Sequence, residues 1–92
     1  MSTFRFTLNP EAAASIHDQG MVILHTGTGC VFSSNGAGAH IWRGVEQQLC
    51  VERIAEELSG TYQIARSAAR EHTMRFLVQL ERHTLIQREV ES

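Results

Sequence analysis

The sequence contains no lysine: its eight basic residues are all arginines, and ten acidic residues outnumber them. The formal net charge is −2 with histidine counted as neutral. A chain with this balance is not built to attract nucleic acid or an anionic membrane through its overall charge. The absence of lysine also excludes a phosphate-binding P-loop, because that motif needs a lysine to reach the phosphates.

Long apolar runs and abundant cysteine are missing as well. No segment approaches the roughly 20 apolar residues that cross a bilayer. Residues 1–10 lack the basic region and apolar stretch of a signal peptide. Two cysteines, Cys30 and Cys50, are too few for a disulfide framework and indicate reduced thiols. We therefore expect a cytoplasmic protein without a membrane partner.

The chain length suits a single domain over residues 1–92, with its core between about 14 and 87. Short stretches of alternating or β-branched apolar residues, separated by glycine-containing turns, predict strands. These strands cover 15–17, 21–25 and 30–34, with turns at Asp18-Gln19-Gly20 and Thr26–Gly29. Together they predict a small antiparallel meander.

The apolar spacing changes to a helical period after Asn35, which we expect to cap the first helix. A second helix covers 51–58 with Gly60 as its C-terminal glycine, and a third covers about 65–83. Residues 85–90 are expected to form an extended tail. The order predicts an α+β fold, a three-stranded antiparallel sheet followed by three helices, which in outline resembles a winged helix-turn-helix domain.

Glycine-rich runs between a strand and a helix often bind phosphate, and Ser33–Trp42 is such a run. A dinucleotide fingerprint needs the pattern GxGxxG, but Ile41 stands at the third glycine position after Gly36 and Gly38. The second parallel strand of a strand-helix-strand unit is also missing. We interpret the small residues as a way for the first helical turn to pack close to the sheet. No cofactor is expected.

Metal binding and catalysis have little support in the sequence. The histidines and cysteines lack the close pairs, such as CxxC or HxxxH, that structural zinc sites show. They are His17, His25, Cys30, His40, Cys50, His72 and His83. A nucleophilic cysteine would also need a neighbouring base and an orienting carboxylate. We expect no metal site and no enzymatic activity from this chain alone, although a site assembled from distant positions stays open at this point.

The alternative function is that of a winged-helix nucleic-acid-binding protein. A basic helix face can contact phosphates, and the third predicted helix carries Arg66, Arg70, Arg75 and Arg82. Glu71 and Glu81 interrupt this face, and the second helix carries further glutamates. Because a solvated helix face of mixed charge explains the pattern more simply, we expect no nucleic-acid partner.

The residues themselves carry a resemblance to a known family. In Val22–Trp42 a strand, a turn and a second strand end in an aromatic residue, followed by Asn35, a Gly-Ala pair and Ile41-Trp42. The stretches 51–64 and 71–86 continue the pattern, with a tyrosine after the second helix and a closing Leu-Ile. This order and spacing resemble the PqqD-like family, the RiPP recognition elements.

The resemblance implies a winged helix-turn-helix-like domain that is not an enzyme and binds the leader of a ribosomally made precursor peptide. The leader adds as a strand beside the third strand, lies against the third helix, and is presented to a modifying enzyme such as a radical SAM protein, a cyclase or a peptidase. Carried over by position, the strand contacts fall on Cys30, Val31, Phe32, Ser33 and Ser34. The helix contacts fall on the exposed edge of the groove at Ala69, His72, Thr73 and Phe76.

Several positions depart from the family pattern. Ser34 stands where leucine is usual, and His72 and Thr73 replace a common Asp-Val pair. We hypothesise that Arg70 and Arg75 attract an acidic leader, because both lie on the third predicted helix. Exposed sheet edges can also pair with each other, so a homodimer stays open.

Overall fold

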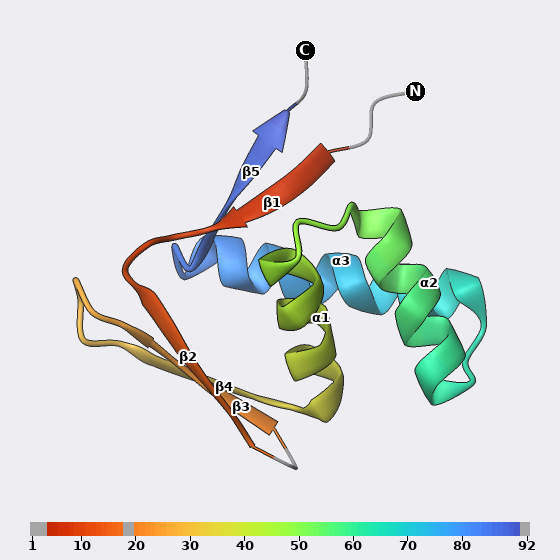
Figure 1. Cartoon of the computed structure of the whole chain (residues 1–92), viewed down its shortest axis with the longest axis horizontal. Helices are drawn as coiled ribbons and strands as arrows, with labels where there is room; N and C mark the ends of the chain where they lie inside the picture. The colour runs from red at the N-terminus through yellow and green to blue at the C-terminus, as the bar shows by residue number, and fades with distance from the viewer. Residues whose placement is uncertain (1–3, 18–19, 91–92) are drawn as a thin grey trace.

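The structure is a computed structural model that describes residues 4–17 and 20–90. Its strands are β1 (Phe4–Leu8), β2 (Ala12–His17), β3 (Gly20–His25), β4 (Val31–Asn35) and β5 (Ile86–Val90). Its helices are α1 (Gly36–Glu46), α2 (Val51–Tyr62) and α3 (Arg66–Arg82). In Figure 1 the sheet of β2, β3 and β4 lies on one side of α1, and β1 and β5 run together away from that sheet. The predicted α+β class and three-stranded antiparallel sheet followed by three helices are confirmed; "winged helix" is only a loose description.

The three-stranded sheet has one covered and one open face. In β3, Met21, Ile23 and His25 are buried on the helix side. Val22 and Leu24 point the other way and stay 39% and 40% exposed. Successive strand residues face opposite sides of a sheet, and this period of two is the signal that predicted the strand. The outer face therefore exposes these two apolar side chains, because the helices cover only the inner face.

The strand bounds differ from the predicted ones. β2 begins at Ala12 rather than at residue 15. β4 begins at Val31, and Cys30 precedes it, although the Cys30 C=O still accepts a hydrogen bond from the His25 N–H at 2.9 Å. Gly29 closes the predicted turn with a φ of +77°, a conformation that glycine adopts without a Cβ clash. The predicted turn at Asp18-Gln19 lies outside the described residues.

A second, two-stranded sheet pairs the two ends of the chain, and its N-terminal strand was not predicted. β1 and β5 run antiparallel, with Phe6 opposite Arg88. Phe6 is only 1% exposed and packs in the main core, and the Arg88 guanidinium carbon lies 5.3 Å from the centroid of its ring. The expected extended tail at 85–90 is thus a strand, and the core includes a residue that precedes position 14.

Asn9 connects the two sheets. Its N–H donates to the Leu85 C=O at 3.0 Å, and its side-chain Nδ2 donates to the Thr84 C=O at 2.7 Å. Its Oδ1 accepts from the Glu11 N–H at 2.9 Å. These bonds tie the corner between β1 and β2 to the turn that follows α3. They therefore fix where the three-stranded sheet sits relative to that helix.

Asn35 caps α1 as predicted, because its Oδ1 accepts a hydrogen bond from the Gly38 N–H at 3.0 Å. Gly38 lies where α1 approaches β4 and α3 most closely. A Cβ on this residue would collide with Ser34 and lie 2.8 Å from Cζ of Phe76. The small residues of the glycine-rich stretch therefore let α1 pack against its neighbours, and Trp42, 1% exposed, enters the core.

The second and third helices bury the predicted apolar stripes. They contribute Val51, Ile54, Ala55 and Leu58 from α2 and Ala69, Thr73, Phe76, Leu77 and Leu80 from α3. The prediction that Gly60 ends α2 was wrong. The helix runs on to Tyr62, and Gln63 adopts the left-handed conformation instead, with a φ of 53° and its N–H donating to the Ser59 C=O. A hydrogen bond from Ser59 Oγ to the Ile64 C=O, at 2.7 Å, holds this helix end in place of a glycine.

Candidate functional site

Strand β4 is an edge of the three-stranded sheet, whose order is β2-β3-β4. Backbone groups in an antiparallel pair point alternately toward and away from the neighbouring strand. Because the His25 N–H donates to the Cys30 C=O, the same alternation directs the backbone groups of Phe32 and Ser34 toward β3. The N–H and C=O groups of Val31 and Ser33 therefore face the free edge.

Helix α3 forms the wall beside this edge. The side chains of Phe32 and Ser34 lie on the same face of the sheet as the core, and both are half-buried. Phe32 packs edge-on against Phe76, with ring centroids 5.9 Å apart. It also contacts His83, with ring centroids 5.2 Å apart. These ring contacts join the inner face of β4 to α3, and we refer to the surface at this junction as the groove, the name that the family resemblance gives it.

One face of α3 follows this groove. His72, Phe76, Gln79 and His83 recur at the spacing of three to four residues that places side chains along one side of a helix. Two members of this face touch Phe32, which fixes its orientation toward β4. None of the four is an arginine, aspartate or glutamate. This face of α3 therefore presents aromatic, imidazole and amide side chains toward the groove between β4 and α3.

Some of the predicted contact residues are exposed at the groove, and others are buried. Val31, Phe32, Ser33 and Ser34 lie in β4, and Cys30 is exposed just before it. On α3, His72 is exposed at the groove and Phe76 is 8% exposed beside Phe32. Ala69 and Thr73 are both 0% exposed, so the expectation that they lie at the exposed edge was wrong. Both lie on the neighbouring face of α3, which packs against the core. That the nine predicted residues contact a peptide stays a prediction.

Sequence reasoning missed Gln79 and His83. The signal that would have found them is the helical spacing that continues from His72 through Phe76. His83 was assigned to the end of the helix, where it is indeed the C-terminal cap residue. Only the position of Phe32 on the neighbouring strand shows that this cap residue faces the groove.

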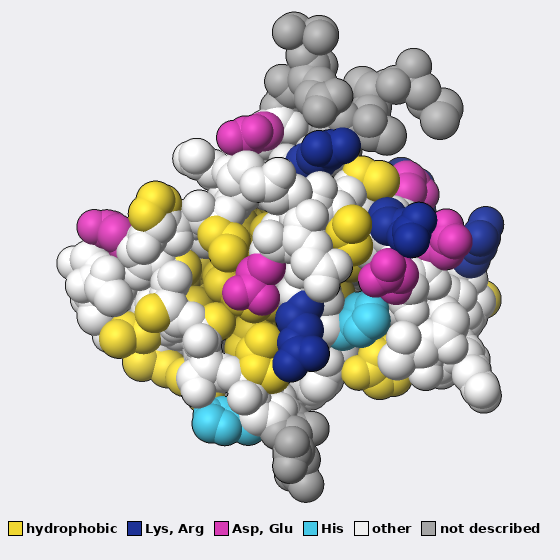
Figure 2. Space-filling model, viewed as in Figure 1, with side chains coloured by type: hydrophobic (Ala, Val, Ile, Leu, Met, Phe, Trp, Pro, Cys, Tyr) yellow, Lys and Arg dark blue, Asp and Glu magenta, His cyan; other side chains and the backbone are white. Residues whose placement is uncertain are grey.

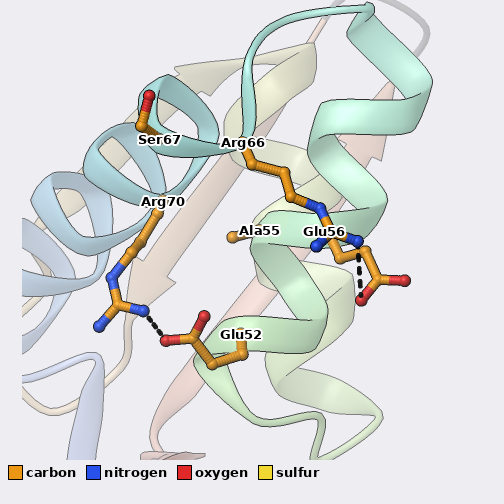
Figure 3. Close-up of a pocket in the computed structure, with 6 residues that line it drawn as sticks. All are labelled: Glu52, Ala55, Glu56, Arg66, Ser67 and Arg70. Atoms are coloured by element: carbon orange, nitrogen blue, oxygen red, sulfur yellow. Dashed lines mark hydrogen bonds and ion pairs between the residues drawn. The ribbon is translucent and has the colours of Figure 1, made fainter.

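Two arginines of α3, Arg66 and Arg70, point toward α2 rather than toward β4. Figure 3 shows Arg70 and Arg66 directed toward α2, where they pair with Glu52 and Glu56 around a hollow of about 350 Å³. Arg75 pairs with Glu71 on α3 itself, at 2.6 Å. Arg70 contacts α2 rather than the groove, so its contacts do not support the hypothesis that it attracts an acidic leader, and that hypothesis stays a prediction.

Figure 2 shows that charged and apolar side chains lie over different parts of the surface. Acidic and basic side chains lie close together over the region of α2, whereas hydrophobic side chains gather over the region of the three-stranded sheet. Exposed pairs of opposite charge contribute little to stability, but they neutralise each other's field. The basic face that a nucleic-acid-binding helix would need is thus broken up by glutamates, which disfavours the alternative function.

Within residues 4–17 and 20–90, no three histidine, cysteine, aspartate or glutamate side chains gather as metal ligands would. No helix among these residues is both long and apolar enough to cross a membrane.

The fold is similar to two solved structures. One is described as TbiB1 in complex with the TbiA(beta) leader peptide; it has a TM-score of 0.82 and 23% identity, over 88% of this chain and 94% of that one. The other is described as lasso peptide synthetase B1 complexed with the leader peptide, with a TM-score of 0.82 and 23% identity, over 90% of this chain and 98% of that one. At this identity the likeness shows a shared fold.

No curated protein matches the chain. Residues 20–86 match the family described as coenzyme PQQ synthesis protein D (PqqD). The matched range runs from the first residue of β3 to the first residue of β5, and it includes β4, all three helices and the groove between β4 and α3. The chain belongs to the PqqD family.

Proposed function

We propose that this chain binds the leader segment of a ribosomally made precursor peptide and presents the peptide to a modifying enzyme. The observation that carries the proposal is the free edge of β4 beside the aromatic groove formed with α3. Two proteins of similar fold are described in complex with leader peptides, which supports the same role here.

The leader adds as a fourth strand next to β4. Its main chain hydrogen-bonds to the N–H and C=O groups of Val31 and Ser33, which face the free edge. Each such bond contributes on the order of 1 kcal/mol net, because it replaces a bond to water. Backbone pairing of this kind supplies affinity that depends little on the leader's sequence.

Discrimination between leaders comes from the groove. Alternate side chains of an added strand point to the helix side of the sheet, where they meet Phe32, Phe76 and His83. A charged leader side chain would lose hydration there without gaining a partner of opposite charge. We infer that the leader places an apolar or aromatic side chain over Phe32. His72 lies farther along the same face of α3 and contacts a neighbouring leader residue.

The chain acts in this scheme as a binding module without catalysis or a cofactor of its own. The chemistry belongs to the partner, a radical SAM protein, a cyclase or a peptidase; one neighbour is described as lasso peptide synthetase B1. We place the encounter in the cytoplasm, where a ribosomal precursor is made. Self-association is a separate proposal and concerns a different sheet edge.

The test uses a synthetic leader from the precursor peptide encoded beside this chain, with affinity measured by calorimetry and contacts by NMR. Ser33→Pro removes a backbone donor at the free edge of β4, and proline is tolerated where the N–H faces solvent. We expect this variant to bind the leader at least about tenfold more weakly. The matched control is Ala14→Pro on β2, the opposite edge, which should bind like the unmodified chain.

The NMR titration decides where the leader lies. Shifts concentrated on residues 31–34 and on His72, Phe76 and His83 support the proposal. Equal affinity of the Ser33→Pro and Ala14→Pro variants, or shifts confined to α2, would contradict it. Binding of duplex DNA that weakens steeply with salt, together with no leader binding, would instead favour the nucleic-acid alternative.

A further inference from the structure

The sheet has a second free edge, at β2, and its backbone groups can be assigned. The Thr26 N–H donates to the Glu11 C=O at 2.8 Å, so Glu11 directs its backbone toward β3. By the alternation of an antiparallel pair, Ala14 and Ile16 direct their N–H and C=O groups away from β3. The Ala12 C=O points the same way, while the Ala12 N–H is already bonded to the Asn9 C=O at 2.9 Å.

This edge lacks the devices that usually prevent pairing with another chain. Natural edge strands carry charged side chains, prolines or bulges for that purpose. The stretch Ala12–His17 contains no proline and no lysine, arginine, aspartate or glutamate, and it pairs with β3 without a break in register. Ala14 and Ser15 at its centre are exposed. The edge of β2 is therefore open to an incoming strand.

We propose that two copies of this chain pair through β2, antiparallel about a twofold axis that passes between Ala14 and the partner's Ala14. In this register the two Ala14 residues exchange a pair of hydrogen bonds, and the Ile16 N–H of each copy donates to the C=O of the partner's Ala12. About four main-chain hydrogen bonds form, since each of these contacts occurs twice under twofold symmetry.

The side chains of the flanking residues suit the same register. Ala12 lies opposite the partner's Ile16, an apolar pair on the inner face of the sheet. Glu11 lies opposite the partner's His17, and both are exposed. This register places no two like charges opposite one another, which would oppose the pairing. The edge is thus complementary to itself in hydrogen bonding and free of repulsive charge pairs.

The dimer is transient and joins two peptide-binding sites. A strand pair of this length buries far less than the roughly 800 Å² per partner of a stable interface. The proportion of monomer and dimer should therefore change with protein concentration over a range that can be measured. The product is one antiparallel sheet with the strand order β4-β3-β2 in one copy continuing as β2-β3-β4 in the other. The two free β4 edges lie at its opposite ends and both stay open to peptide.

The experiment is sedimentation equilibrium on the full chain over a concentration series, without any peptide. The unmodified chain should move from its mass of 10.3 kDa toward twice that value. Ala14→Glu and Ala14→Lys each place two like charges directly opposite one another, so each variant alone should dimerise about tenfold more weakly. An equal mixture of the two variants at low salt should restore dimers, because the charges are then opposite.

The control carries the same new charge at the other edge. Ser33→Glu lies on β4, is exposed, and should leave the monomer–dimer equilibrium unchanged. A chain that stays at 10.3 kDa at every concentration would overturn the proposal. So would a mixture that fails to restore dimers, or growth beyond the dimer, which would indicate pairing of β2 with β4 of the next copy. Because no leader is used, the result is independent of whether β4 binds one.

Discussion

Gly38 and Gly60 both lie inside helices but have different surroundings. A Cβ at Gly38 would collide with Ser34 and lie 2.8 Å from Cζ of Phe76. At Gly60, no atom of the described residues lies within 4 Å of such a Cβ. The first glycine is required by close packing at the junction of α1, β4 and α3. The second only adds backbone entropy to the unfolded chain, which disfavours the helix.

This contrast gives a matched pair of substitutions. Gly38→Ala should lower the free energy of unfolding by about 1–3 kcal/mol, because Ser34 and Phe76 must shift to admit the methyl group. Gly60→Ala should raise it by about 0.5–1 kcal/mol, since alanine favours a helix interior over glycine. Urea unfolding measures both effects, provided that the dependence of the unfolding free energy on urea concentration has the same slope in each variant. A stabilising effect of Gly38→Ala would contradict the packing described here.

Single residues also show how far the sequence could lead to the site. Phe32 and Phe76 were predicted and lie together in the groove. Ala69 and Thr73 were placed at its edge but belong to the core, and His83 was missed. Helical periodicity tells which residues share a face, but it does not tell which neighbouring element each face meets. Which face of α3 meets the groove depends on where β4 lies, and the spacing of residues along α3 does not reveal that.

At the level of elements, the structure contains the predicted helices and the predicted hairpin of β3 and β4, because local sequence signals specify them. Their period, caps and turn glycines are local signals, as the hydrogen bond between Asn35 and Gly38 illustrates. Strand β1 was missed although Phe6 and Leu8 alternate with Arg5 and Thr7. Its partner β5 lies at the other end of the chain, and such a pairing leaves no local mark on the sequence.

The pairing of the chain ends should matter for stability. Phe6 is 1% exposed, packs in the core, and has the Arg88 guanidinium over its ring. Phe6→Ala should therefore cost about 3–5 kcal/mol of unfolding free energy, a large part of the 5–15 kcal/mol typical of a small domain. Arg5→Ala, on the exposed side of the same strand, should change stability by no more than about 0.5 kcal/mol.

Thermal and urea unfolding of the two variants test this prediction. A Phe6→Ala variant as stable as Arg5→Ala would mean that β1 contributes nothing to the fold. The domain would then be held by the elements that follow β1 along the chain. A loss of the expected size would show instead that the family's fold is completed here by a strand from outside residues 20–86, the range that matches the family.

At the level of the whole molecule, most of the ion pairs of α3 lie apart from the proposed peptide-binding edge. Arg66 and Arg70 pair with glutamates of α2, and Arg75 pairs with Glu71. Phe32, Phe76 and His83 meet at the groove between β4 and α3. The net charge of −2 is small. We therefore expect contacts made at the free edge of β4 to depend mainly on main-chain hydrogen bonds and apolar packing.

The affinity for the leader should accordingly depend little on salt. Salt screens interactions between exposed charges, with a Debye length of about 10 Å at 0.1 M, but it hardly weakens apolar contacts or main-chain hydrogen bonds. Raising the salt from about 50 to 200 mM at neutral pH should change the dissociation constant by less than about threefold. By comparison, a protein that neutralises several phosphates of DNA loses about 10³-fold or more in affinity over the same range. Calorimetry with the leader at each salt concentration measures this. A steep loss would show that arginines outside the groove attract the leader, with Arg82, whose side chain follows Gln79 on α3, as the first residue to substitute.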